Sequence, residues 1–389
     1  MIPWLDPLAR PGPAAFLALF FIETVGRTLL IAVVPLQGLA ILGDAQKVSL
    51  LYFGASIAGL LFSFAVPWLI RRFRRRGVVV LGAGANLAAA AALATETSAG
   101  LAVGLWLHIV GTACLEIPLN LYVLDYVRRH ELSRFEPNRI FVAAAAWMLC
   151  PGLGVALRTY VAPWAPFAAS AIATLVLLLY FRWVRGTDEP PRPPIVPANP
   201  LRYLHRFFAQ PRLRLAWTLA LGRAGWWMLF FVYAPIYAVT FGLGEVAGGA
   251  IVSAGGLMLF LTPLWGWIAR RFGMRPTLAV GYGATGALTG AVMAVAGEPL
   301  LGAAFLVGSA LAASVIDGVG NATFLRAVRP LERAEMTTAF NTFRHVAQIV
   351  TPGVFAVLLE TFDLAAVFLA GGACMAAMAI LSFYIPRRM

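Results

Sequence analysis

Twelve apolar stretches follow one another along this 389-residue chain, each about as long as a helix that crosses a membrane. Such a helix needs roughly 20 mostly apolar residues, because the hydrocarbon core of a bilayer is about 30 Å thick. Charged residues make up only 12% of the chain, against about 25% in soluble domains. The sequence therefore predicts an all-α membrane protein. The expected spans are roughly 14–42, 48–70, 78–96, 100–126, 140–161, 164–184, 213–241, 246–269, 276–296, 299–324, 337–359 and 364–385.

One long polar stretch separates the sixth expected span from the seventh, and it contains the proline-rich segment 186–194. Closely spaced prolines prevent a continuous helix, so we interpret the stretch as a linker. The predicted organisation is an N-terminal six-helix bundle (residues 1–184), a cytoplasmic linker (185–212) and a C-terminal six-helix bundle (213–389). Residues 202–214 are expected to form a short helix on the membrane surface.

The basic residues gather on one predicted side of the membrane. Of the 30 lysines and arginines, 25 fall at the two termini, in the even-numbered loops or in the linker. Lys47 and Arg158 are expected on the opposite side. The positive-inside rule then predicts that the N- and C-termini are both cytoplasmic. Because the net charge of +13 arises from these clusters, it is a topology signal, and no nucleic-acid partner is expected.

The two halves of the sequence repeat each other at an offset of about 200 residues, as parallel repeats do when each half has an even number of spans. Four matches in the same order carry this interpretation. They are Pro67–Phe73 with Gly266–Phe272, Pro151-Gly152 with Pro352-Gly353, Gly26-Arg27 with Gly222-Arg223, and Glu116–Asn120 with Asp317–Asn321.

Two sets of six spans, with a charged loop after the second span of each set, resemble the major facilitator superfamily. The resemblance implies secondary transport by alternating access, with spans one, four, seven and ten lining a central cavity. The family's loop pattern, Gly-x-x-x-Asp-Arg-x-Gly-x-Arg, corresponds here to residues 67–76 and 266–275. Arg71 and Arg270 stand where the family has Asp. In the family that acid belongs to a cytoplasmic charge relay, so the relay must differ in this chain.

Charged residues inside the expected spans are the strongest functional signal. An ionised side chain at the bilayer centre costs at least about 2.5–3.5 kcal/mol, so it must face a partner or water. We predict two pseudo-symmetric ion pairs, Arg27 with Glu116 and Arg223 with Asp317. Such pairs also serve as structural links between helices, but four charged cavity helices favour function. The expected substrate and proton site comprises Glu23, Arg27, Glu116, Asn120, Arg223, Asp317, Asn321, Asn341, Arg344 and His345.

Other residues carry weaker interpretations. Arg71, Arg72, Asp125, Arg270 and Arg271 are expected to form cytoplasmic gate or loop contacts. The lone His108 is interpreted as a structural residue. The aromatic residues of span seven are expected either to line the cavity or to pack, and the glycines of span nine to allow close helix contact. These two sets are Trp226, Trp227, Tyr233 and Tyr237, and Gly281, Gly283, Gly286 and Gly290.

Several classes of function are excluded by what the sequence lacks. Lys47 is the only lysine and no phosphate-binding glycine loop precedes it, so no ATP-driven pump is expected. No pair of histidines has metal-ligand spacing and no nucleophile elbow occurs, so neither an enzyme nor a metal or other cofactor is expected.

Secondary transport is the class of function that remains. The chain is predicted to be a monomeric, proton-coupled transporter of a small anionic, zwitterionic or amphiphilic organic solute, embedded in the lipid bilayer of a bacterial inner membrane. Two alternatives stay open. One is efflux of drugs or metabolites by proton antiport, and the other is a lipid-handling or assembly protein that has lost coupled transport.

The charged spans generate a first prediction. If Glu116 exchanges the coupling proton, Glu116→Gln removes the titratable group and uncouples transport from the pH gradient. Solute flux in proteoliposomes with an imposed pH gradient measures this. Flux that still follows the gradient in the variant would remove Glu116 from the mechanism.

Overall fold

The computed structural model of the chain describes residues 12–126, 129–184, 200–295, 297–328 and 333–386. Throughout these ranges the regular structure is helical, without a strand. Among the residues described, twelve helical segments are long and apolar enough to cross a membrane, as the sequence predicts. The proline-rich linker 186–194 lies outside the described residues.

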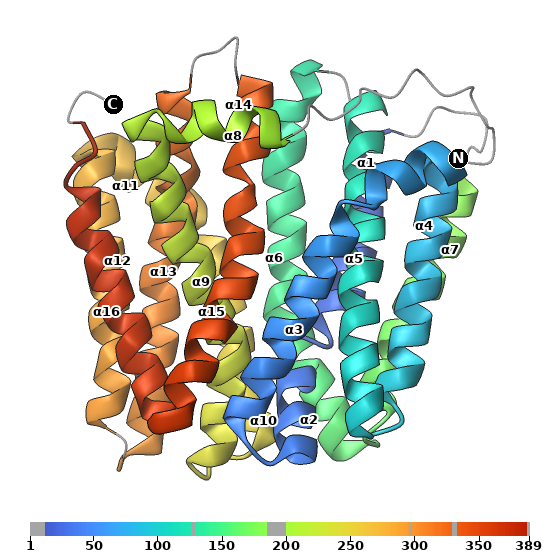
Figure 1. Cartoon of the computed structure of the whole chain (residues 1–389), viewed down its shortest axis with the longest axis horizontal. Helices are drawn as coiled ribbons and strands as arrows, with labels where there is room; N and C mark the ends of the chain where they lie inside the picture. The colour runs from blue at the N-terminus through green and yellow to red at the C-terminus, as the bar shows by residue number, and fades with distance from the viewer. Residues whose placement is uncertain (1–11, 127–128, 185–199, 296, 329–332, 387–389) are drawn as a thin grey trace. The chain divides into compact units, whose positions relative to one another are not determined.

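The chain divides into two compact units (Figure 1). The first unit comprises residues 1–41 and 55–196, and the second comprises residues 42–54 and 197–389. In the first unit α1 packs against α5, α6 and α7, while α4 packs against α5 and α7. The helices up to the linker are α1 (Pro13–Thr28), α2 (Val33–Leu42), α3 (Ala45–Ser63), α4 (Val66–Leu93), α5 (Ser98–Tyr126), α6 (Arg129–Tyr160) and α7 (Ala165–Val184).

The second unit is built around α9, which contacts α10, α13, α15 and α16. It also takes residues 45–54 of α3, so this one helix contributes to both units. After the linker the helices are α8 (Pro200–Phe208), α9 (Pro211–Thr240), α10 (Glu245–Met258), the 3-10 turn η2 (Leu259–Leu261), α11 (Thr262–Phe272), α12 (Met274–Ala294), α13 (Pro299–Ala327), α14 (Arg333–Phe340), α15 (Thr342–Thr361) and α16 (Leu364–Ser382).

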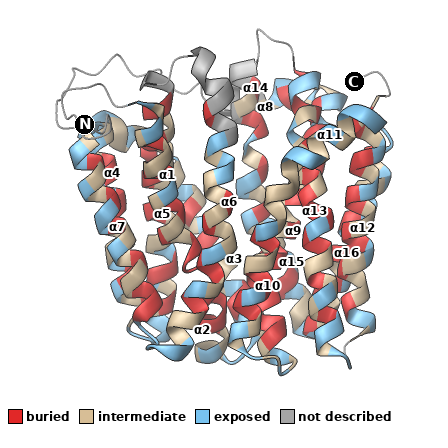
Figure 2. Ribbon diagram, turned by 180° about the vertical axis from the view of Figure 1, so that it is seen from behind, coloured by how far each residue is buried: buried red, intermediate tan, exposed pale blue. Residues whose placement is uncertain are grey.

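Large apolar side chains cover the outer faces of these helices. Leu61, Leu179, Val280, Val357 and Ile380 are each between 65% and 69% exposed. Figure 2 shows exposed and buried residues alternating around most helices, with burial where helices of one unit face each other. Exposed aliphatic surface of this kind is suited to lipid, where a helix satisfies its own backbone hydrogen bonds. Prolines lie inside α5, α9 and α15, where neighbouring helices and local adjustments of the backbone compensate for the hydrogen bond that each proline removes.

Small residues set the closest helix contacts, as predicted for span nine. A methyl group on Gly286 of α12 would lie 2.8 Å from the carbonyl oxygen of Gly372 on α16, so only glycine allows this approach. A methyl group on Gly283 would meet nothing nearer than 3.8 Å. The two helices run side by side in Figure 1. Close contact is therefore confirmed for Gly286 but not for every glycine of the set.

Two predicted boundaries differ from the structure. The second span was expected to run to residue 70, but α3 ends at Ser63 and the segment from Val66 onward is joined to the third span in α4. Pro67 lies in the first turn of this segment, where proline is favoured. The surface helix expected over 202–214 ends at Phe208, since Pro211 starts α9.

The bend after the second span has the same backbone conformation in both units. Gly273, between α11 and α12, has φ 95° and ψ 149°. Arg74, at the equivalent point of α4, has φ 60° and ψ 165°. Essentially only glycine adopts this region without strain, because a Cβ clashes with the backbone there. The family's loop pattern has glycine at this position, and the first half of this chain departs from it.

A stabilising substitution follows from this strain. Arg74→Gly should raise the free energy of unfolding by about 1 kcal/mol, because relief of about 1–3 kcal/mol of strain exceeds the entropy cost of a glycine. The measurement is the midpoint of thermal unfolding of the purified protein in detergent. Arg72→Gly, two residues earlier in ordinary helix, is the control and should cost about 1 kcal/mol. Equal destabilisation by both variants would contradict strain at Arg74.

Candidate functional site

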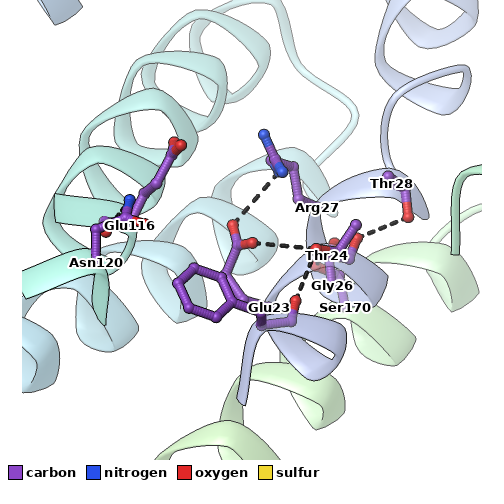
Figure 3. Close-up of polar contacts among 9 residues, drawn as sticks. Glu23, Thr24, Gly26, Arg27, Thr28, Glu116, Asn120 and Ser170 are labelled. Carbon is purple, nitrogen blue, oxygen red and sulfur yellow. Dashed lines mark hydrogen bonds and ion pairs between the residues drawn. The ribbon is translucent and has the colours of Figure 1, made fainter. Parts of the chain in front are cut away.

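In the first unit, two charged residues of α1 form an ion pair one helical turn apart. Arg27 Nε lies 3.4 Å from Glu23 Oε1 (Figure 3). The Glu23 side chain is only 5% exposed and that of Arg27 is 31% exposed. Thr24 donates a hydrogen bond to the other carboxylate oxygen of Glu23, at 3.5 Å. Residues four apart share one helix face, so α1 alone brings these charges together.

The backbone around this pair is held by α7. Ser170 Oγ donates a 2.7 Å hydrogen bond to the carbonyl oxygen of Gly26 (Figure 3). A methyl group on Gly26 would lie 3.5 Å from Ala173 Cβ, which is an ordinary van der Waals distance, so α7 packs directly against this turn without requiring glycine there. The backbone next to Arg27 is therefore held by a hydrogen bond from a neighbouring helix.

Glu116 lies beside this pair without joining it. Its carboxylate interacts electrostatically with Glu23 and Arg27, yet the ion pair of Arg27 is with Glu23. One turn further along α5, Asn120 donates to the Glu116 carbonyl oxygen at 2.9 Å and accepts a 2.9 Å hydrogen bond from Arg139 of α6. Two carboxylates thus surround the single guanidinium of Arg27.

In the second unit the ion pair joins two helices. Arg223 Nε of α9 lies 3.5 Å from Asp317 Oδ1 of α13, and the Arg223 side chain is 8% exposed. Arg223 also donates a 2.9 Å hydrogen bond to Asn321 Oδ1. Trp227 Nε1 donates to Asp317 Oδ2 at 2.6 Å. Charge-assisted hydrogen bonds hold both partners where an unpaired charge would be costly.

An aromatic ring completes this second cluster. The Arg223 guanidinium carbon lies 5.9 Å from the ring centroid of Phe343 on α15, and that of Arg344 lies 5.8 Å from the same ring. Arg344 also interacts electrostatically with Asp317. A methyl group on Gly320 would lie 2.9 Å from Arg223 Nη1, so the glycine leaves room for the guanidinium. The site therefore offers cationic and aromatic groups together.

One of the two predicted pairs is correct and the other is wrong. Arg223 pairs with Asp317 as expected, but Arg27 pairs with Glu23 instead of Glu116. The physical reason lies one turn before each arginine. Glu23 precedes Arg27 by four residues, whereas the equivalent residue before Arg223 is Leu219. Without an acid on its own helix, Arg223 reaches across to α13.

The remaining predicted residues lie around these clusters or outside the described part of the chain. Asn341, Arg344 and His345 are exposed where α14 gives way to α15. Asp125 is in the last turn of α5, and its side chain lies outside the described residues. Arg71 and Arg72 are exposed in α4, as are Arg270 and Arg271 in α11.

Sequence reasoning missed two polar contacts. Trp227 was expected either to line the cavity or to pack, although its indole donates directly to Asp317. Arg139 was assigned to a cytoplasmic cluster, although it reaches Asn120. The spacing of Trp227 four residues after Arg223 places both on one face of α9 and would have indicated the first contact. Nothing in the spacing of Arg139 indicates the second.

The histidine interpreted as structural also lies near the first cluster. His108 on α5 interacts electrostatically with Arg27. Residues 108, 112, 116 and 120 follow one another at intervals of four, so they form a polar stripe along one face of α5. Among the residues that the structure describes, no three His, Cys, Asp or Glu side chains are grouped to hold a metal ion.

Comparison with known proteins places the fold. The profile described as the Major Facilitator Superfamily matches residues 16–310 and 257–389. A search of curated protein sequences found no match. A crystal structure described as a peptide transporter POT in complex with sulfate superposes with a TM-score of 0.74, 17% sequence identity, 97% of this chain covered and 95% of that chain.

Two further solved structures have the same fold. A POT family transporter in complex with 5-aminolevulinic acid gives a TM-score of 0.75 at 13% identity, covering 96% of this chain and 97% of that chain. A D-xylose-proton symporter gives 0.73 at 12% identity, again covering 96% of this chain and 97% of that chain. At these identities the likeness concerns the fold.

The Arg223–Asp317 contact generates a prediction about stability. Arg223→Gln and Asp317→Asn should each destabilise the protein, and the double variant should be more stable than the sum of the two changes by about 0.5–3 kcal/mol. Removing one partner leaves the other charge buried and unpaired, whereas removing both does not. Reversible unfolding in mixed micelles provides the free energies of unfolding.

The control cycle combines Asp317→Asn with Arg270→Gln, an exposed arginine of the same unit. These changes should add within about 0.3–0.5 kcal/mol. Additivity in the Arg223 cycle as well would show that the ion pair contributes nothing to stability.

Proposed function

Because the chain belongs to the Major Facilitator Superfamily, we propose that it is a proton-coupled secondary active transporter. It moves a small organic solute with an anionic or zwitterionic group across the bacterial inner membrane by alternating access. Both termini face the cytoplasm, and the two six-span halves (1–184 and 213–389) joined by the linker 185–212 are its two domains. One observation carries the proposal: each unit holds an arginine against a carboxylate inside its membrane-spanning helices.

The first cluster is suited to proton binding. Arg27 has two neighbouring carboxylates and forms its ion pair with one of them, Glu23. When Glu23 binds a proton it loses its charge, and the attraction that holds Arg27 falls. The guanidinium is then available to Glu116 or to an anionic group of the solute. Proton binding and solute binding are thereby linked through one arginine, because each changes the free energy of the other.

The second cluster is suited to solute binding. Arg223 presents a guanidinium, which binds carboxylate or phosphate groups in a bidentate manner. Trp227 and Phe343 add aromatic surface beside it. This combination favours an anionic group attached to an apolar or aromatic body. Among the similar structures, the peptide transporter and the POT family transporter in complex with 5-aminolevulinic acid support a small organic solute, and the D-xylose-proton symporter supports proton coupling.

The experiment is flux into proteoliposomes under an imposed pH gradient, across a panel of organic anions, zwitterions and amphiphiles. The wild-type chain should accumulate at least one class of solute when the gradient is present. Glu23→Gln should reduce gradient-driven accumulation to the level of empty liposomes, since the amide cannot carry the proton. Exchange of labelled for unlabelled solute without a gradient should persist in this variant.

Glu360→Gln is the matched control, because Glu360 is an exposed acid at the end of α15. It should leave both activities unchanged. Gradient-driven accumulation that survives Glu23→Gln would exclude this residue as the proton carrier. A wild-type chain that moves no member of the panel under any gradient would overturn the proposed function and favour a lipid-handling role.

A further inference from the structure

An exposed cluster of tryptophan, arginine and phenylalanine lies near the bend that follows the second span of each half. In α11 it comprises Trp267, Arg270, Arg271 and Phe272, and in α4 it comprises Trp68, Arg71, Arg72 and Phe73. All eight side chains are exposed. Trp267 is 47% exposed and Phe272 is 66% exposed. We call these the α11 cluster and the α4 cluster. The transport scheme proposed for the intramembrane charges does not use them.

The arginines of the α11 cluster fold back along their own helix. The Arg271 guanidinium carbon lies 5.6 Å from the ring centroid of Trp267 and 5.7 Å from that of Phe272. Arg270 Nη1 lies 3.7 Å from the position that a methyl group on Gly266 would take. Helical side chains lean toward the N-terminus of their helix, so both guanidiniums are directed back toward the body of the span.

The length of the span places this cluster at the level of the lipid headgroups. The helix from Glu245 to Phe272 has 28 residues, which at 1.5 Å per residue is about 42 Å. The hydrocarbon core is about 30 Å thick and the whole bilayer about 40–45 Å. The last turns therefore lie in the headgroup layer. Tryptophan is enriched at this depth because its ring is amphipathic.

The positive charge of the α11 cluster favours binding of an external anion. Within the described residues, Arg270 and Arg271 form no ion pair with an acidic side chain. The family's loop pattern has an acid at the position of Arg270, but this chain has a second positive charge. Two adjacent guanidiniums attract a phosphate group strongly, since each can donate two parallel hydrogen bonds to it.

The same arrangement recurs in the first half. Arg71 and Arg72 are exposed in α4, and the Arg72 guanidinium carbon lies 5.6 Å from the ring centroid of Phe73. Here too the acid of the loop pattern is replaced by arginine, Arg71. Because the replacement is found in both halves, the positive charge is a shared property of the two clusters.

We infer that the α11 cluster binds the phosphate of an anionic phospholipid, with the α4 cluster as its pseudo-symmetric counterpart. Arg270 and Arg271 bind the phosphate, and the Trp267 and Phe272 rings contact the glycerol and upper acyl chain. The exposed rings favour a lipid over a free anion, because free phosphate has no apolar part for them to cover. Basic residues next to a membrane span attract anionic lipids in this way.

The test measures lipid binding to the purified full chain in detergent, by native mass spectrometry and by the shift in melting temperature. Phosphatidylglycerol should bind saturably, whereas phosphatidylcholine of the same chain length should bind far more weakly. The double variant Arg270→Gln/Arg271→Gln should weaken binding at the α11 cluster roughly 30-fold, from the attraction expected for two arginines at an anionic membrane surface. The α4 cluster stays intact, so one tightly bound lipid should be lost.

Two controls separate the possible results. Arg212→Gln/Arg214→Gln removes two exposed arginines from the start of α9 in the same unit and should leave lipid binding unchanged. An equal loss in this control would mean that diffuse charge attracts the lipid, which overturns the inference. Trp267→Ala keeps both arginines and should weaken lipid binding without affecting inorganic phosphate.

Inorganic phosphate and glycerol 3-phosphate are the competing probes. Neither should displace phosphatidylglycerol at millimolar concentration. Displacement by inorganic phosphate would show an anion site without lipid specificity and would also overturn the inference. The lipid-free melting temperature of each variant should equal that of the wild type, since all the substituted side chains are exposed.

Discussion

The free-energy cost of leaving a charged side chain without a partner in hydrocarbon determines how charged residues are arranged inside this protein. An ionised side chain within a span must be neutralised by a neighbour or reached by water. Both units meet this requirement with one guanidinium and at least one carboxylate, although the carboxylate comes from the same helix in one unit and from a neighbouring helix in the other. In the second unit the ion pair also depends on Gly320, which leaves room for the Arg223 guanidinium.

Most of the fold was predictable because lipid imposes a simple rule on sequence. Each span must be apolar and long enough, and the backbone must be helical, so twelve spans could be counted directly. The internal repeat could also be recognised in the sequence, since Arg27 and Arg223 follow equivalent glycines. The boundary between α3 and α4 was not, because the chain bends at Phe64 and Ala65 inside an apolar run that carries no sequence marker beyond Pro67.

The charged clusters were predictable in composition but only partly in pairing. Depth along a helix can be estimated from residue counts, and it correctly brings Arg223 to Asp317. Depth cannot decide which of two acids forms the ion pair when both lie near one arginine, as Glu23 and Glu116 do at Arg27. That choice depends on helix rotation and side-chain direction. The contact from Arg139 to Asn120 could not be anticipated, because it depends on how α5 and α6 lie against each other.

The unequal bends after the second spans bear on how the duplicated halves have diverged. Gly273 adopts the bend without strain, while Arg74 holds the same backbone conformation with a side chain that is strained there. The two bends therefore differ in conformational strain energy. Under thermal agitation the amide protons around Arg74 should exchange with water sooner than those around Gly273, since the strained copy opens at lower cost. The two halves therefore share one architecture but differ in the local stability of this bend.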